Sequence, residues 1–145
     1  MTRMKVPLPS PEDIEQQFYE ALQQADIDKL MAVWSDEDEI ACIHPGGPRL
    51  VGAGPIRAAF DAMFANGSVD AHAERVRRVQ MNGASVHHVL ERVQVATDEG
   101  ARSAWVLATN VYLKTEQGWR MVLHHASPGS ARDLQEISEA PSTLH

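Results

Sequence analysis

Apolar and polar residues in the first half of the chain alternate with the repeat of an α-helix. In "PEDIEQQFYEALQQ", residues 11–24, the apolar positions recur at spacings of three and four, which places them on one face of a helix. Two further segments, 27–35 and 55–65, share this pattern. Ser10 and Asp26 directly precede the first two segments, and both residue types cap the free N–H groups of a first helical turn. The sequence therefore predicts three N-terminal helices.

The second half of the chain changes to strand-like runs. Four of these runs are rich in β-branched and aromatic residues, and they span residues 69–81, 85–97, 101–113 and 118–127. They are separated by short turn sequences, namely "NG" at 82–83, "DEG" at 98–100 and "EQG" at 116–118. Short turns between consecutive strands predict an antiparallel meander.

Helices followed by antiparallel strands predict an α+β fold in one domain. A chain of 145 residues is long enough for a single well-buried core. We expect the domain to span residues 11–128, with an N-terminal extension at 1–10 and a solvated C-terminal tail at 129–145.

Charge and cysteine content narrow the range of partners. The formal net charge of −7 argues against nucleic acid and against an anionic membrane surface, because both require clustered Lys and Arg. The N-terminal segment is interrupted by prolines before any long apolar stretch develops, so we expect no membrane anchor. Cys42 is the only cysteine, which predicts a reducing compartment, the cytoplasm. The sequence has no phosphate-binding glycine motif, and we expect no cofactor.

Two pairs of adjacent histidines lie on the predicted strands. These are His87 with His88, and His124 with His125. Since consecutive side chains of a strand point to opposite faces, at most one member of each pair can face a given pocket. No cysteine or carboxylate stands at a helpful spacing, so no metal site is predicted.

His44 is a candidate for acid/base chemistry. In "IACIHPGGPRL" it follows an apolar run and precedes Pro45, which places its imidazole on a loop at the end of a strand. There it could exchange a proton at the mouth of a cavity, because its pKa lies near neutrality. Alternatively, its imidazole bonds a nearby backbone group and holds the turn.

The order of these parts resembles a known family. The capped helix, the stretch "ALQQADIDKLMAVWSDEDEIACIHPGGPRLVGAGPIRAAF" and the strands ending in "GWRMVLHHASP" resemble the SnoaL-like branch of the nuclear transport factor 2-like superfamily, over residues 11 to 128. The stretch "TNVYLKTEQGWRMVLHHAS" resembles the association domain of calcium/calmodulin-dependent protein kinase II. The resemblance implies a cone-shaped fold, in which three helices pack on a curved antiparallel sheet and enclose an apolar pocket. It specifies no reaction, because this fold carries many functions.

Ketosteroid isomerase, a relative of known chemistry, gives a comparison residue by residue. The resemblance places its general-base Asp at His44, its oxyanion-binding Asp at Asn110 and its hydrogen-bonding Tyr at Phe18. Because all three side chains differ in chemistry, steroid isomerisation itself is not expected. The same comparison places His125 in the cavity, and His44, Asn110 and His125 become the predicted catalytic residues.

Further residues are expected to line the pocket beside Phe18. The comparison directs Leu123 and Ser127 to the cavity, strand alternation from Asn110 adds Tyr112, and Trp34 is an aromatic candidate. The predicted function is the binding of a small, largely apolar molecule, with isomerase, cyclase or dehydratase chemistry left open.

The opposite face of the sheet is predicted to bind a second copy of the chain. Strand alternation directs Trp105 and Leu107 there, and the comparison directs His124 there as well. In this superfamily the convex face commonly pairs with another subunit, so the resemblance implies a homodimer. The alternative function is therefore a non-catalytic dimerisation or assembly module of the kinase association type.

Overall fold

A computed structural model describes residues 7–130, 132 and 136–139 of the chain. Its first element is α1 (Pro11–Gln24), which begins as the sequence predicts. The Ser10 hydroxyl accepts a hydrogen bond from the Asp13 N–H at 3.1 Å, and the Asp13 carboxylate accepts one from the Ser10 N–H at 3.0 Å. This reciprocal cap fixes the start of the helix. Burial of Ile14, Phe18 and other apolar side chains on one face then anchors α1 to the sheet.

The other two helices are close to the predicted segments. The second, α2 (Ile27–Met31), begins with Asp26 as its cap but ends four residues earlier than predicted. It ends there because the backbone enters a strand-like bridge, in which the Met121 N–H donates to the Val33 carbonyl at 2.8 Å. The third helix, α3, spans Ala53–Phe64.

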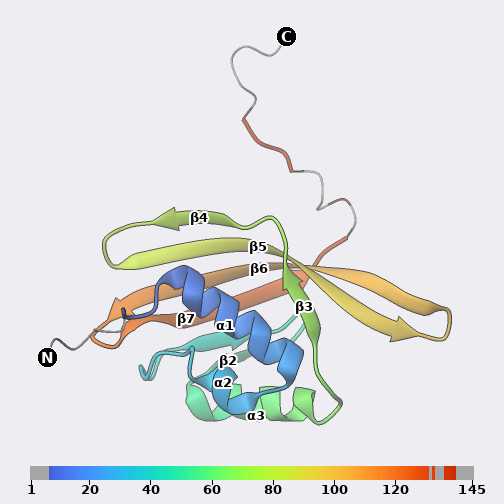
Figure 1. Cartoon of the computed structure of the whole chain (residues 1–145), viewed down its shortest axis with the longest axis horizontal. Helices are drawn as coiled ribbons and strands as arrows, with labels where there is room; N and C mark the ends of the chain where they lie inside the picture. Colours follow the sequence, from blue (N-terminus) through green and yellow to red (C-terminus); the bar gives the residue numbers. More distant parts are fainter. Residues whose placement is uncertain (1–6, 131, 133–135, 140–145) are drawn as a thin grey trace, which may run out of the picture.

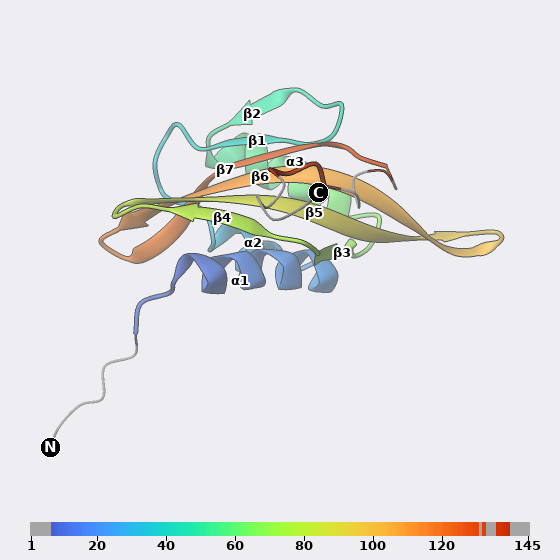
Figure 2. The same ribbon diagram turned by 90° about the horizontal axis from the view of Figure 1, so that it is seen from above.

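Seven strands form one open and strongly curved sheet (Figures 1 and 2). Their bounds are β1 (Ala41–Ile43), β2 (Arg49–Val51), β3 (Asp70–Ala73), β4 (Arg77–Gln80), β5 (Ala84–Thr97), β6 (Gly100–Thr115) and β7 (Gly118–Pro128). The order is β2-β1-β7-β6-β5-β3, with β4 also paired to β5. The predicted run 69–81 is thus two strands. The α+β fold is confirmed, and the sheet is mixed because β1 runs parallel to β7.

The sheet has an inner face, which α1 covers, and an outer face (Figure 2). Directly opposed residues of neighbouring strands share a face, so the register assigns each side chain to one of them. The inner face and the helices enclose the apolar core, which includes Phe18 and Phe60. The hairpin of β5 and β6 extends beyond the rest of the sheet (Figure 1). No helix in the described part of the chain has the length and apolarity needed to cross a membrane.

The flanking segments were predicted at 1–10 and 129–145. Residues 1–6, 131, 133–135 and 140–145 of these segments lie outside the described residues. Two described parts contact the domain. The Pro9 carbonyl accepts a hydrogen bond from the Trp119 N–H at 3.3 Å, and Glu136 pairs with Arg77. The three segment boundaries stay a prediction.

Candidate functional site

A cavity of about 130 Å³ lies between the helices and the inner face of the sheet. Most of its wall is apolar, and the polar side chains on it are His44, Glu91 and His124. They come from the end of β1, from β5 and from β7. The remaining wall consists of Phe18, Leu22, Pro45, Phe60, Met63, Val69, Ala71, Val93, Val106 and Ala126. An apolar cavity with a few converging polar groups is typical of a small-molecule site.

Two of these polar groups are the ends of a continuous chain of hydrogen bonds. The Tyr19 hydroxyl donates to Glu91 Oε2 at 2.6 Å. Asn110 Nδ2 donates to the Tyr19 oxygen at 3.1 Å, and Asn110 Oδ1 lies 2.6 Å from His124 Nδ1. We call the side chains of Tyr19, Glu91, Asn110 and His124 the inner relay. All four are buried, so each bond replaces one that water would otherwise provide.

The inner relay fixes the protonation of His124. Asn110 Oδ1 can only accept, so His124 Nδ1 carries the proton and, in the neutral ring, Nε2 is an acceptor. Burial lowers the pKa of His124 to about 3, and the neighbouring His44 and His125 add to this lowering. The ring is therefore neutral near pH 7, and it can accept a hydrogen bond from a molecule in the cavity.

Glu91 is shifted in the opposite direction. Burial raises the pKa of its carboxyl to about 7, and the hydrogen bond from Tyr19 partly opposes the rise. Burial, together with the adjacent charge of Glu91, raises the pKa of Tyr19, which keeps the phenol protonated as a donor. A carboxyl with a pKa near the working pH is suited to both taking up and releasing a proton.

His44 occupies the wall on the other side of His124. Its ring centroid lies 6.3 Å from that of His124 and 5.0 Å from that of Phe60. Its Nε2 lies 3.7 Å from Cys42 Sγ, and burial lowers the pKa of the imidazole. The turn that follows is closed by the backbone, since the Gly47 N–H donates to the His44 carbonyl at 2.8 Å. The imidazole lines the cavity, and it forms no hydrogen bond with the backbone of any described residue.

The structure changes the predicted orientation of β7. Leu123, His125 and Ser127 were expected to face the cavity, and His124 to face outward. His124 is instead 5% exposed and lines the cavity, while His125 and Ser127 lie on the outer face. Leu123 does not line the cavity either.

The observed orientation results from a β-bulge. Tyr112 pairs with Met121, whereas Val111 pairs with Leu123, so one extra residue is inserted in β7 at Val122. The insertion reverses the alternation beyond that point. Met121 and the later residue His124 then share the inner face, although an odd number of positions separates them.

The other predicted site residues divide into three groups. Phe18 lines the cavity as predicted, and Asn110 lies behind its wall in the inner relay. Tyr112 and Trp34 are buried core residues that do not line this cavity. Leu107 is 42% exposed on the outer face and Trp105 is half-buried. The catalytic role of Asn110 and the interface role of Trp105 and Leu107 stay predictions.

Two residues of the inner relay were not found from the sequence. The comparison with ketosteroid isomerase places that enzyme's hydrogen-bonding Tyr at Phe18, which has no hydroxyl. Tyr19 is the next residue and has one. Glu91 has the same strand parity as Ser85, His87 and Val89, which are all buried. The sequence signal that could have identified Glu91 is therefore a carboxylate at a strand position that alternation predicts to be buried.

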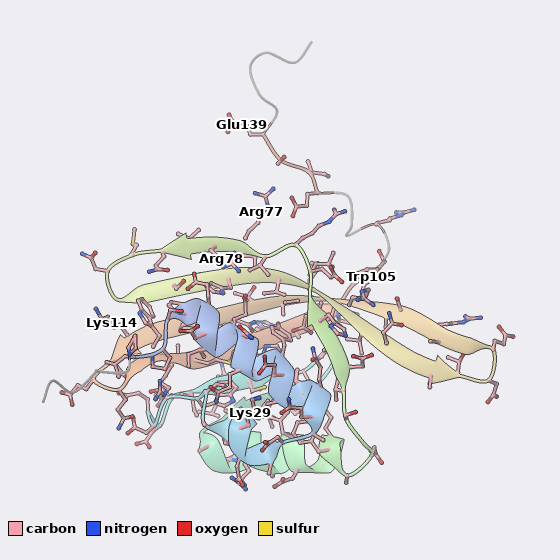
Figure 3. All side chains as sticks on the ribbon, viewed as in Figure 1. Lys29, Arg77, Arg78, Trp105, Lys114 and Glu139 are labelled. Atoms are coloured by element: carbon pink, nitrogen blue, oxygen red, sulfur yellow. The ribbon has the colours of Figure 1, made fainter. Side chains whose placement is uncertain are left out.

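A second buried polar cluster ties α1 to β5. Glu15 Oε2 lies 2.7 Å from His87 Nδ1, and His87 Nε2 lies 3.1 Å from Ser85 Oγ. Arg78 Nη2 donates to Glu15 Oε1 at 3.2 Å, and Figure 3 labels Arg78 between β4 and α1. The order of acid, imidazole and hydroxyl is that of a nucleophilic triad. Ser85 and His87 are fully buried, however, so this cluster connects the two elements and presents no nucleophile.

Among the residues described, no three His, Cys, Asp or Glu side chains are placed to hold a metal ion. A cofactor with a charged phosphate would find no cationic side chain on the wall of the inner cavity. The chemistry available there is proton transfer and hydrogen bonding.

Comparisons with known proteins agree with this fold. The chain matches the family described as SnoaL-like domain over residues 12–131. Among curated proteins, none matches the chain.

Several solved structures are similar to this chain, at different levels of sequence identity. A presumed calcium/calmodulin-dependent protein kinase type II association domain from Thiobacillus denitrificans is 36% identical, with a TM-score of 0.77, over 87% of this chain and 100% of the other. A presumed dehydratase of the NTF2-like family from Streptomyces avermitilis is 26% identical, with a TM-score of 0.72, over 81% and 93% of the two chains. The CaMKII hub of S. rosetta, at 19% identity and a TM-score of 0.66 over 88% and 100%, shares the fold.

Proposed function

Because this chain belongs to the SnoaL-like domain family, we propose that its inner cavity binds a small, largely apolar molecule and moves a proton on it. The observation that carries the proposal is the inner relay, which connects an ionisable carboxyl and a neutral imidazole, both on one apolar wall. A similar structure described as a dehydratase supports proton chemistry in this fold.

The cavity limits the size of the molecule. A cavity of roughly 150 Å³ in another protein holds benzene, and the volume here is about 130 Å³. The ligand therefore has an apolar body of about six to eight non-hydrogen atoms. One oxygen-bearing group on the ligand would form hydrogen bonds with the polar side chains of the wall.

Four of the polar residues have a proposed role. Glu91 is the base, because its second oxygen, Oε1, forms no hydrogen bond with any described residue and its pKa of about 7 suits proton transfer. His44 is the proposed donor to the oxygen on which negative charge develops. Asn110 and Tyr19 are positioning residues, since they hold His124 and Glu91 in place.

The proposed step is proton abstraction next to a carbonyl. Glu91 takes the proton, the electron pair of the broken C–H bond forms an enolate, and the proton then returns to the same or another carbon. If the proton returns to a different carbon, the product is an isomer. If a hydroxyl group lies β to the carbonyl, its protonation and departure as water gives dehydration.

Cyclohexanone, with seven non-hydrogen atoms, is a direct probe of this step. We expect the protein to accelerate exchange of its α-protons in D2O at pH 7, measured by NMR, and Glu91→Gln to abolish the acceleration. Glu74→Gln, a change at a carboxyl that is paired with Arg92 away from the cavity, is the control. Exchange that is equal with and without protein, or unaffected by Glu91→Gln, would refute the assignment.

Self-association is the second candidate function. The outer face exposes Val79, Met81, Leu107 and Leu113 by 39 to 75%. Several exposed apolar side chains on one face are typical of an interface. The relative of 36% identity, described as a kinase association domain, favours the same function.

A measurement of mass in solution tests this surface. We propose a homodimer through the outer face, which Leu107→Asp would convert to monomer. Val95→Asp is a matched control, because Val95 is 43% exposed on the extended β5–β6 hairpin. If the native chain is a monomer at 100 μM, or if both variants dissociate equally, the proposed interface is wrong.

We also propose a cytoplasmic setting. Cys42 is buried as a free thiol, and burial raises its pKa to about 12, so it is not a reactive thiolate. The net charge of −7 gives no support for a nucleic acid partner. Detection of the protein outside the cytosolic fraction of its host would contradict this location.

A further inference from the structure

A second cavity, a groove of about 340 Å³, lies on the outer face of the sheet. Four of its polar residues come from neighbouring strands and form one cross-strand row. Arg77 of β4 lies opposite His88 of β5, His88 opposite Thr109 of β6, and Thr109 opposite His125 of β7. Since opposed residues share a face, the row presents a guanidinium, two imidazoles and a hydroxyl on one side. We call this cavity the outer groove.

The C-terminal segment places a carboxylate in the outer groove. Glu136 Oε2 accepts a hydrogen bond from Arg77 Nε at 3.1 Å and a second from Arg77 Nη2. Figure 3 shows Arg77 on the side of β4 that faces this segment, whereas its neighbour Arg78 is directed toward α1. Glu136 itself lines the groove. The contact therefore joins two parts of the chain that are 59 residues apart.

The groove retains binding capacity with Glu136 in place. Its other polar side chains form no hydrogen bond with any described residue, and they are Arg75, His88, Thr109, His125 and Ser127. Leu90 and Leu107 form an apolar part of the lining. Although the chain has a net charge of −7, this surface carries two arginines close together, which attract an anion.

We propose that the outer groove is a carboxylate-binding site, occupied by Glu136 of the chain's own C-terminal segment, and that a free carboxylate ligand competes with Glu136 for Arg77. A ligand with a second acidic group would also reach Arg75. A short apolar spacer between the two groups would contact Leu107. The chemical class is thus a small dicarboxylate, and the C-terminal segment regulates access to the site. This inference is independent of the inner cavity and of its proposed reaction. It applies to the chain with its outer face free, because a homodimer through that face would cover the groove.

Glutarate is the probe for the test, and glutaramide is its uncharged counterpart. Binding is measured in the full chain by the shifts of the His88 and His125 C2 protons in NMR, which His88→Gln and His125→Gln assign. We expect Glu136→Gln to strengthen glutarate binding by about threefold or more, because an occupied site lowers the apparent affinity. Glutaramide should cause no shift.

Arginine variants establish where glutarate binds. In the Glu136→Gln background, Arg77→Gln should weaken binding by roughly fivefold or more. Arg102→Gln is the matched control, because this exposed arginine pairs with Glu99 and does not line the groove. All three side chains to be changed are exposed, so the fold should be retained.

Each remaining outcome overturns a defined part of the proposal. Equal affinity in the native chain and in Glu136→Gln would show that the C-terminal carboxylate does not occupy the site. No shift in either protein, or equal losses from Arg77→Gln and Arg102→Gln, would show that the groove is no carboxylate site. Because the groove shares its face with the proposed dimer interface, the mass of each variant is measured in the same buffer.

Discussion

His124 and Asn110 are direct cross-strand partners, and their side chains meet at 2.6 Å on the inner face of the sheet. This contact connects the cavity wall to Tyr19 and Glu91, since Asn110 also donates to the Tyr19 oxygen. The same amide thus satisfies two buried polar groups. Its loss would leave His124 Nδ1 without its partner and would remove the donor to the Tyr19 oxygen, whose own hydrogen bond to Glu91 would remain.

We therefore expect Asn110→Ala to lower the free energy of unfolding by about 2 kcal/mol, the typical cost of unsatisfied buried polar groups. Urea denaturation at pH 7 measures this. Gln94→Ala is the control, because Gln94 donates only to Ser103 at 3.3 Å in an exposed position. A loss no larger than that of the control would mean that the inner relay contributes nothing to stability.

Glu91 predicts a stability loss as pH rises. Its folded pKa of about 7 lies above the unfolded value, so the folded state binds more protons between the two. The contribution of Glu91 is fully present below the unfolded pKa and is lost as pH rises toward about 7. The difference in unfolding free energy, Glu91→Gln minus native, should increase across pH 4.5 to 7 by at most about 1.4 kcal/mol per pH unit. A difference that is constant with pH would contradict the raised pKa.

His124 predicts the opposite dependence. Its folded pKa of about 3 lies below the unfolded value, so the unfolded state binds more protons in between. The native chain should lose stability as pH falls from about 6.5, relative to His124→Gln, by at most about 1.4 kcal/mol per pH unit. Paired denaturation series down to pH 4 measure this. His88→Gln, a change at an exposed position, is the control.

Glu15 is expected to be far more important for stability than Glu12, although both lie on the first turns of α1. Glu15 is buried against His87 and Arg78, whereas Glu12 is exposed and lies 3.8 Å from Arg78. Glu15→Ala should cost about 3 to 5 kcal/mol, because it leaves buried polar groups unpaired. Glu12→Ala should cost less than about 1 kcal/mol. Similar losses in urea denaturation would show that the cluster of Glu15, His87 and Ser85 is not a stabilising contact.

Much of the fold could be predicted from local sequence patterns. Ser10 and Asp13 determine the start of α1, and the turn at 82–83 joins two strands as expected. These features depend on residues three or four positions apart, so the sequence displays them directly. The second helix ended early because Val33 and Trp34 pair with β7, a contact that local patterns do not contain.

The candidate site was predicted in part. His44, Asn110 and Phe18 were assigned near the cavity, and the structure places His44 and Phe18 on its wall and Asn110 behind it. The base that the proposal requires, Glu91, was missed, as was Tyr19. They lie 72 residues apart, and no motif joins them.

Local patterns in the sequence were enough to predict the helices, the hairpins and the rule that only one of His124 and His125 could face the cavity. Which of them does so was decided by the tertiary structure. The bulge at Val122 reverses the alternation in β7, and counting along the strand gives the wrong face beyond it. The packing of α1 across the sheet then brings Tyr19 to Glu91 and Asn110. Alternation is a local property, whereas register and packing depend on contacts between distant parts of the chain.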